Sequence, residues 1–373
     1  MKSSEPRIFS SGGIMKTFSQ PGVSLLVLIS VLIGSLCIQG CKKAEPVNPG
    51  QASSKVSIAV FIPGVMAGSA IYEMLADGAT KAADDFNAQN PGKEVSVTVI
   101  EGGFNQAEWE NQITTLSAAG AYDLIVSSNP SLPEIVSSVS IKFPVQKFLL
   151  LDGELAGNPS VYTLRYNQRE QAYMAGYIAA LASLDAAGND VQTRSAEKRL
   201  GLVAGQEYPV MNTIILPGFT DGARAVDPLF TVDFRVVGNW FDAAKGAELA
   251  AGMIRSGVRV ILPVAGGAGQ GVVQAAAEAG AKVIWFDTNG YAIRPGTVIG
   301  SAILRQDRAA YEKVMLFLKG ELPFGAAEIA GTAAGFVDFI EDDPLYLETV
   351  SLSIREKQAE LTSALRSGRL KLD

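Results

Sequence analysis

The main part of this chain alternates short apolar segments with segments whose apolar residues recur at helical spacing. Apolar segments of this kind are typical of strands buried on both faces, and the alternation favours parallel sheets covered by helices. Two consecutive series appear, so the sequence predicts an α/β fold of two doubly wound, Rossmann-like lobes. The expected strands are 56–61, 95–100, 123–126, 147–151, 199–204, 231–237, 260–264, 282–286 and 298–304, and the expected helices are 72–87, 107–119, 132–138, 170–182, 213–226, 243–256 and 269–279.

Two facing lobes would hold a ligand between them, because doubly wound sheets bind ligands at the carboxyl ends of their strands. We expect a hinge, with the chain crossing between lobes near 163–167, 299–303 and 327–331. The polar segment 188–198 is expected to be a loop. The resulting division is lobe 1 (55–165), lobe 2 (166–301), a return to lobe 1 (302–328), and the end of lobe 2 with a C-terminal helix (329–373).

The segment before these lobes is typical of an exported protein. Lys16 precedes the nearly apolar run 23–36, which is shorter than the ~20 residues of a membrane-spanning helix. The run leads to Ile38-Gln39-Gly40-Cys41, which is similar to a lipobox, with Gln39 where a small residue is usual. We predict a lipoprotein signal peptide (1–40), acylation of Cys41, and a flexible spacer (41–54) that tethers the protein to a membrane facing the periplasm or the exterior. An ordinary signal peptide or an uncleaved anchor is the alternative.

Composition excludes several classes of protein. The net charge of −7 argues against nucleic-acid binding, which rests on basic residues that meet phosphates. The chain has no histidine, and its two cysteines, Cys37 and Cys41, both precede the lobes. Catalytic arrangements that need histidine or a thiol are therefore excluded in the lobes, and we expect no metal and no cofactor.

Four stretches carry a resemblance to a known family. They are Phe143-Pro144-Val145-Gln146-Lys147-Phe148, Asn167-Gln168-Arg169-Glu170, Asn239-Trp240-Phe241-Asp242-Ala243-Ala244-Lys245-Gly246, and the glycine-rich Val264-Ala265-Gly266-Gly267-Ala268-Gly269-Gln270-Gly271. Together they resemble the basic membrane protein family, also called PnrA-like, which comprises solute-binding lipoproteins of certain ABC importers. The resemblance implies a periplasmic-binding-protein type I fold, an ABC permease and ATPase as partners, and a monomer that binds a small molecule.

One loop departs from the nucleoside-binding members of that family. Those members carry an acidic pair followed by Ser-Phe-Asn after the first strand, whereas residues 63–74 here read PGVMAGSAIYEM. The replaced loop looks more similar to that of the family's riboflavin-binding lipoproteins. We therefore expect riboflavin or a related flavin as ligand, with a purine nucleoside as the alternative.

Candidate ligand-binding residues lie where expected strands end. Trp240 is expected to stack on the ligand ring, with Tyr72 as its partner from the other lobe. Asp152 and Asp287 can accept hydrogen bonds from hydroxyl or ring N–H groups, although either can instead cap the following segment. Asn129 is a candidate donor and acceptor, or a turn residue.

Two further candidates complete the expected site. Gly266 and Gly267 form a turn that lets the backbone approach a ligand closely, or simply a tight turn. Arg305 is expected to pair with Asp287 or to meet a ligand carbonyl, unless it is a solvated surface residue.

The residues therefore favour a binding protein. An enzyme such as a nucleoside hydrolase would need a metal-binding acidic cluster, and the clusters at 84–85 and 341–343 look like solvated surface. A ligand sensor that signals to a membrane kinase would share the same site and is a further alternative.

Overall fold

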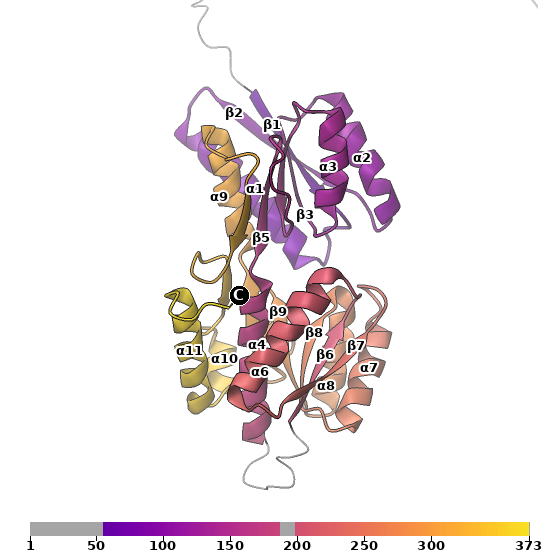
Figure 1. The fold of residues 1–373 in the computed structure, drawn as a ribbon, viewed down its shortest axis with the longest axis vertical. Coiled ribbons are helices and arrows are strands. Elements are labelled where there is room, and N and C mark those ends of the chain that lie inside the picture. The colour runs from indigo at the N-terminus through magenta and orange to yellow at the C-terminus, as the bar shows by residue number, and fades with distance from the viewer. Residues whose placement is uncertain (1–54, 187–197, 373) are drawn as a thin grey trace, which may run out of the picture. The chain divides into compact units, whose positions relative to one another are not determined.

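The structure, a computed structural model, describes residues 55–186 and 198–372. The expected signal peptide, Cys41 and the spacer lie outside the described residues, and so does most of the loop expected at 188–198. Figure 1 shows the described part, with its strands gathered into two sheets.

Sheet A forms the core of lobe 1. Its strands run in the order β11-β5-β4-β3-β1-β2, and every neighbouring pair is parallel. Successive side chains of β1 point to opposite faces, so Ile58 and Val60 enter one apolar cluster while Ala59 and Phe61 enter another. Both faces are thus buried, as the apolar strands predicted. The strands are β1 (Lys55–Ile62), β2 (Glu94–Glu101), β3 (Leu124–Ser128), β4 (Lys147–Leu151), β5 (Val161–Tyr166) and β11 (Ala327–Ala330).

Sheet B repeats this arrangement in lobe 2. Its order is β12-β10-β9-β8-β6-β7, so five of its strands match those of sheet A position by position. The edge strand β12 differs, because it runs antiparallel to β10 rather than parallel as the doubly wound pattern predicts. The strands are β6 (Arg199–Ala204), β7 (Thr231–Val236), β8 (Val260–Val264), β9 (Lys282–Asp287), β10 (Val298–Leu304) and β12 (Val337–Phe339).

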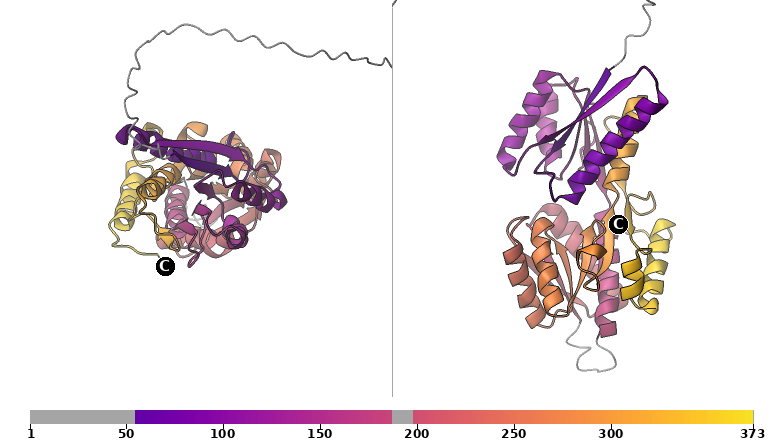
Figure 2. Two further views of the ribbon diagram at one scale, coloured as in Figure 1. Left: turned by 90° about the horizontal axis from the view of Figure 1, so that it is seen from above. Right: turned by 180° about the vertical axis from the view of Figure 1, so that it is seen from behind.

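Helices cover both faces of each sheet. The pairs α1 with α9 and α2 with α3 lie on sheet A, while α4 with α6 and α7 with α8 lie on sheet B. Figure 2 shows α9, from late in the chain, beside α1 from its beginning. The helix expected at 213–226 begins with a π-helical turn, Met211–Ile215. The α-helices are α1 (Ala70–Gln89), α2 (Gln106–Ala119), α3 (Leu132–Lys142), α4 (Gln168–Ala186), α6 (Leu216–Val226), α7 (Ala243–Arg255), α8 (Gly269–Glu278), α9 (Gln306–Lys319), α10 (Pro344–Thr349) and α11 (Leu352–Arg366).

The chain passes between the two sheets three times. It leaves sheet A after β5 to begin α4, leaves sheet B after β10 to begin α9, and leaves β11 to form β12. The boundaries expected at 301/302 and 328/329 fall inside β10 and β11, and Tyr166 is still part of β5. The chain leaves β5 after Tyr166, β10 after Leu304 and β11 after Ala330.

Glycines allow the helices of one pair to approach closely. A Cβ on Gly176 of α4 would lie 2.0 Å from the carbonyl oxygen of Phe219, and one on Gly222 of α6 would lie 2.1 Å from that of Tyr173. The backbones of α4 and α6 are therefore in close contact. This helix pair covers one face of sheet B, and α4 is joined directly to β5 of sheet A.

Candidate functional site

Asp152 and Asp287 occupy equivalent places in the two lobes. Asp152 directly follows β4 and Asp287 ends β9, and these strands are each third in their sheets. Their φ angles of 55° and 73° make them the only non-glycine residues with left-handed backbone in the described part of the chain. Such a conformation is uncommon and tends to persist at functional sites, where the surrounding structure holds it.

The two carboxyls lie close enough to influence each other. Burial, followed by the charge of Asp287, raises the pKa of Asp152 to about 7, against a smaller opposing effect of Arg165. Burial also raises the pKa of Asp287 to about 6, while a hydrogen bond from Gln171 lowers it. Both pKa values therefore lie closer to neutral pH than those of ordinary surface carboxylates.

Three tyrosines surround the carboxyl pair. Tyr208, in the loop after β6, lies near both carboxyls, and burial followed by their charges raises its pKa. Tyr166, the last residue of β5, feels both charges too, and its hydroxyl donates to Gln306 Oε1 at 2.9 Å. Tyr72 feels Asp152 and has its pKa raised mainly by burial. These hydroxyls stay protonated and can donate hydrogen bonds.

Trp240 lies next to this group on the lobe 2 side. Its ring centroid is 5.9 Å from that of Tyr208, with the planes tilted by 51°. Its Nε1 donates to Gln206 Oε1 at 3.1 Å, and the indole lies so close to Gly205 that a Cβ there would clash with it. The side chain is 38% exposed, so part of the ring remains available to a ligand.

The glycine-rich turn supports Trp240. Gly266 has a φ of 53°, and a Cβ on it would lie 3.0 Å from the Trp240 carbonyl oxygen. A Cβ on Gly267 would lie 3.5 Å from the same oxygen, and the backbone N–H of Ala268 donates to it at 3.2 Å. Gly266 and Gly267 were expected to let the backbone approach a ligand closely. In this structure they let the backbone of the turn approach the Trp240 carbonyl oxygen.

Tyr72 and Asn129 form a pair within lobe 1. Asn129 Nδ2 donates to the Tyr72 hydroxyl at 3.5 Å, and that hydroxyl donates to the Pro63 carbonyl oxygen at 3.1 Å. Asn129 Oδ1 also accepts from the backbone N–H of Ser131, which is the turn contact weighed as an alternative. Tyr72 is linked to Trp240 only through Asp152 and Tyr208, and no direct contact joins the two rings.

Arg305 does not pair with Asp287, contrary to one of the two roles expected for it. Its side chain is exposed, and among the described residues Asp287 takes its hydrogen bond from Gln171 instead. Arg305 follows the last residue of β10, where its backbone N–H donates to the Phe336 carbonyl oxygen at 2.9 Å. The chain turns here to leave sheet B, and this turn directs the side chain to solvent.

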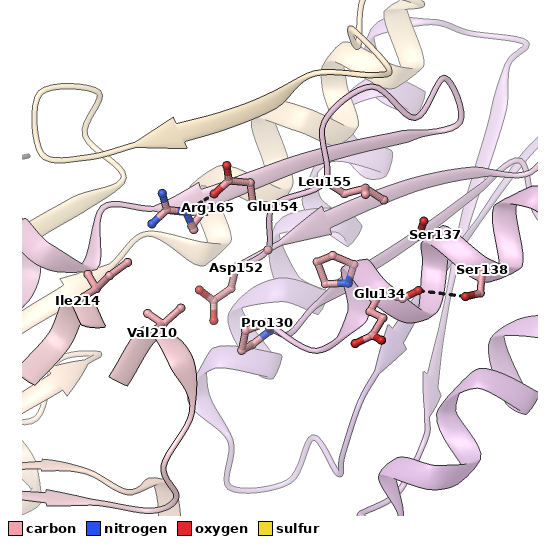
Figure 3. Close-up of a pocket in the computed structure, with 12 residues that line it drawn as sticks. Pro130, Glu134, Ser137, Ser138, Asp152, Glu154, Leu155, Arg165, Val210 and Ile214 are labelled. Atoms are coloured by element: carbon pink, nitrogen blue, oxygen red, sulfur yellow. Dashed lines mark hydrogen bonds and ion pairs between the residues drawn. The ribbon is translucent and has the colours of Figure 1, made fainter. Parts of the chain in front are cut away.

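A wide-mouthed cavity of about 700 Å³ opens beside Asp152. Most of its lining comes from lobe 1, and Val210 and Ile214 come from lobe 2. Figure 3 shows the Asp152 carboxyl between Pro130 and Val210, with Arg165 bound to Glu154 through a contact of 2.8 Å. Asp152 therefore faces a space bounded by both lobes.

Sequence reasoning missed Tyr208, Gln206 and Gln171. Tyr208 and Gln206 could have been found, because they follow the strand 199–204 at the edge where ligands bind. Gln171 lies inside α4, and only the fold brings it to Asp287. Within residues 55–186 and 198–372, no acidic cluster suitable for a metal ion is present. Over the same residues, no helix has the length and apolarity that crossing a membrane requires.

Comparison with known proteins identifies related sequences. The family model described as ABC transporter substrate-binding protein, PnrA-like, matches residues 55–370. Over 151 residues the chain is 30% identical to a protein of Lactococcus lactis named ABC transporter nucleoside-binding protein BmpA, covering 40% of this chain and 39% of that one. It is 27% identical over 168 residues to the CD4+ T-cell-stimulating antigen of Listeria monocytogenes, of which it spans 43%. Basic membrane protein A1 of Borrelia garinii is 22% identical over 323 residues, 85% of this chain and 88% of that one.

Solved structures share the fold. A solute-binding protein of an ABC transporter system from Aeropyrum pernix matches with a TM-score of 0.69 and 24% identity over 85% of this chain and 93% of that one. A transcriptional activator of the comK gene from Bacillus halodurans matches with a TM-score of 0.65 and 19% identity over 85% of this chain and 100% of that one. At these identities the likeness confirms the predicted fold class of two doubly wound lobes.

Proposed function

The chain belongs to the PnrA-like family of ABC transporter substrate-binding proteins, and we propose that it binds a small aromatic heterocycle carrying hydroxyl groups between its lobes. The family is the one that the four motifs predicted, and its members are binding proteins rather than enzymes. The observation that carries the proposal is the convergence of Asp152 and Asp287, one from each lobe, near Tyr208 and Trp240.

The chemistry of these side chains selects the ligand class. Carboxylates accept hydrogen bonds, so they favour hydroxyl or ring N–H groups, and such charge-assisted bonds are strong and directional. The partly exposed indole of Trp240 offers a surface on which a flat ring can stack. A few polar groups beside aromatic ones are the usual composition of small-molecule sites. An anionic ligand is disfavoured, because it would meet two carboxyls.

A purine nucleoside is the first candidate. It has both a flat ring with N–H groups and a ribose with adjacent hydroxyls. The related Lactococcus lactis protein is named as nucleoside-binding, which supports this choice over the flavin expected from the loop at 63–74.

Riboflavin is the second candidate because of that loop. Here Gly64 has a φ of 155°, Met66 N donates to Glu101 Oε1 at 2.8 Å, and the Tyr72 ring packs against Gly64. The loop therefore presents an aromatic ring in place of the acidic pair that nucleoside binders carry. A three-ring flavin would use more aromatic surface than a purine does.

Titration calorimetry with inosine, guanosine, adenosine and riboflavin tests the proposal, with free ribose as a control. We expect one heterocycle to bind with one-to-one stoichiometry and ribose to bind far more weakly. Mass analysis of any compound released by denaturing the purified protein gives an independent identification. Failure of every heterocycle to bind, or recovery of a chemically altered ligand after long incubation, would overturn the proposal.

We further propose that the protein is exported, acts as a monomer, is held at a membrane by a lipid on Cys41, and delivers its ligand to an ABC permease and ATPase. The family supports the transport role. The lipid rests on the Ile38-Gln39-Gly40-Cys41 sequence alone.

Replacement of the lipidated residue tests the anchor. Cys41→Ala removes the thiol that would carry the acyl chains, so we expect the variant to leave the membrane fraction or to remain unprocessed. Two acyl chains hold a protein stably, because each buried methylene contributes ~0.8 kcal/mol. Cell fractionation and intact mass measure the effect, with Cys37→Ala as the matched control. A Cys41→Ala protein of processed mass that still sediments with membranes contradicts the proposal.

A further inference from the structure

Gln171 joins the site carboxyl of lobe 2 to the connections between the lobes. It lies in the first turn of α4 and is fully buried. Its Nε2 donates to Asp287 Oδ1 at 3.0 Å and to the Ala302 carbonyl oxygen of β10 at 3.0 Å. One amide group thus holds the end of β9 and the neighbouring strand.

The orientation of this amide is dictated by its partners. Both are oxygen acceptors, so only the NH2 side can face them, and the reverse orientation would place Oε1 against two oxygens. Oε1 is consequently turned away and has no hydrogen-bond partner although it is buried. An unsatisfied buried acceptor is costly, so the contact with Asp287 and Ala302 outweighs that cost in the folded protein.

Residues around the same helical turn also bind the connection from β11 to β12. Asn167 N donates to the Ala330 carbonyl oxygen at 2.9 Å, at the end of β11. Glu170 Oε2 accepts from the backbone N–H of Thr332 at 2.7 Å, in the connection from β11 to β12. The Asn167-Gln168-Arg169-Glu170 motif and Gln171 are therefore joined by hydrogen bonds to the segments where the chain passes between lobes, and Gln171 links Asp287 to them.

We propose that Gln171 is a positioning residue, which keeps the carboxylate of Asp287 ionised and fixed in orientation so that its second oxygen can accept a hydrogen bond from the ligand. The ligand part of this inference rests on the proposed function. The effect on Asp287 itself does not depend on any ligand.

The surroundings of Asp287 make such support necessary. Burial favours the protonated carboxyl, and the facing ionisable groups are all acidic: Asp152 after β4, Tyr208 after β6 and Tyr166 at the end of β5. Arg305, at the end of β10, is exposed and forms no ion pair with Asp287. The hydrogen bond from Gln171 lowers the pKa of Asp287 against this background. Without it, Asp287 would be protonated at higher pH and would lose its value as an acceptor.

Carbon-13 NMR of the side-chain carboxyls tests this effect in the protein without ligand. The Asp287 signal is assigned by its loss in Asp287→Asn. In Gln171→Met we expect the titration midpoint of Asp287 to rise by about one pH unit, the effect of losing one hydrogen bond to a charged group. Gln171→Glu has nearly the same shape, and its added carboxyl should make the pair retain one proton at a pH where wild-type Asp287 has lost its own.

Gln358→Met is the matched control. Gln358 is a fully buried glutamine of α11 whose two amide atoms have no hydrogen-bond partner. The control makes the same substitution at equal burial, and we expect it to leave the Asp287 midpoint unchanged. If Gln171→Met fails to fold, the isosteric Gln171→Glu carries the test.

Affinity for inosine and riboflavin between pH 5 and pH 8.5 gives the second readout. Wild-type affinity should fall as Asp287 becomes protonated, and in Gln171→Met the same fall should begin about one pH unit higher. An unchanged Asp287 midpoint in Gln171→Met would overturn the inference and leave the proposed function intact. If none of inosine, guanosine, adenosine and riboflavin binds wild type, the proposed ligand class is wrong, while the NMR titration still decides the role of Gln171.

Discussion

Asp152 connects the chemistry of the site to the stability of the fold. Its pKa is raised from 3.8 to about 7 by burial and by Asp287, so the folded protein holds this proton more tightly than the unfolded chain does. The free energy of unfolding therefore falls as the pH rises from about 4 to about 7. A ligand that donates hydrogen bonds to the ionised carboxyl offsets this loss.

Asp152→Asn should restore the stability that the wild-type protein loses as the pH rises. The substitution removes the charge and suits a left-handed backbone, so we expect the ligand-free protein to melt a few °C higher than wild type at pH 8, and by a smaller margin at pH 5. Thermal melts at both values check this, with Asp77→Asn on the exposed face of α1 as the control. Equal melting shifts at pH 5 and pH 8 would show that Asp152 does not carry the buried proton.

Trp240 provides a second test at the residue scale. Trp240→Ala removes the partly exposed ring, and we expect ligand affinity to fall by ~1–3 kcal/mol from lost burial and stacking. Trp240→Phe keeps a ring while losing the hydrogen bond to Gln206, so its loss should be smaller. Calorimetry measures both variants, and unchanged affinity in Trp240→Ala would remove the indole from the binding surface.

Sequence reasoning could place most candidate residues at strand ends but could not orient them. Asp152 follows β4 and Asp287 ends β9, and both strands are apparent from their apolar residues. Arg305 also follows a strand, yet its side chain turns to solvent, because the chain changes lobes there. Gln171 was beyond reach because its partner lies 116 residues further along the chain. Strand ends follow from local pattern, whereas the contacts between them follow from long-range packing.

At the scale of elements, the contact between α4 and α6 limits what the chain tolerates. Gly176→Ala would place a methyl group 2.0 Å from the Phe219 carbonyl oxygen, which forces the two helices apart. We expect the free energy of unfolding to fall by ~1–3 kcal/mol or more, as overpacking against backbone usually does. Chemical denaturation measures the loss.

A matched glycine gives the control for this substitution. Gly252 lies in α7, and a methyl group there would meet the ends of the flexible Arg235 and Arg255 side chains rather than backbone. Gly252→Ala should therefore be neutral or slightly stabilising, since alanine favours a helix by ~1 kcal/mol over glycine. Similar losses in the two variants would mean that the close contact of α4 with α6 is not what holds Gly176.

The elements differ in how well the sequence predicts them. Most central strands were predicted because both faces are apolar, as in β8, where all five residues are buried. β5 was not predicted, although five of its six residues are buried. β11 and β12, with four and three residues, are too short for any pattern to reveal. Their places are set by the third connection between the lobes, and the antiparallel direction of β12 follows from its entry at the edge beside β10.

In the whole molecule, the edges of the two lobes contact each other at a point away from the three connections. Phe104 follows β2 and Phe241 follows β7, which are equivalent edge strands, and their ring centroids are 6.2 Å apart. Both side chains are largely exposed, at 74% and 68%. The contact is small enough to break and reform as lobes move.

Small-angle scattering tests for movement between the lobes. We expect the radius of gyration to fall when a saturating heterocycle is added, because a ligand held by both carboxyls draws the lobes together. Asp287→Ala with the same compound is the control and should show no change. An identical radius with and without bound ligand would indicate that the lobes do not move.

The equivalent positions of Asp152 and Asp287 affect how readily the two lobes close when no ligand is bound. When empty lobes approach, they must either bring two like charges together or hold a proton, so closure without ligand should become less favourable as the pH rises. A permease that recognises the closed form would then seldom bind the unloaded protein, and little ATP would be hydrolysed without transport of the ligand. The facing carboxyls would thus help the permease to discriminate between the loaded and the unloaded protein.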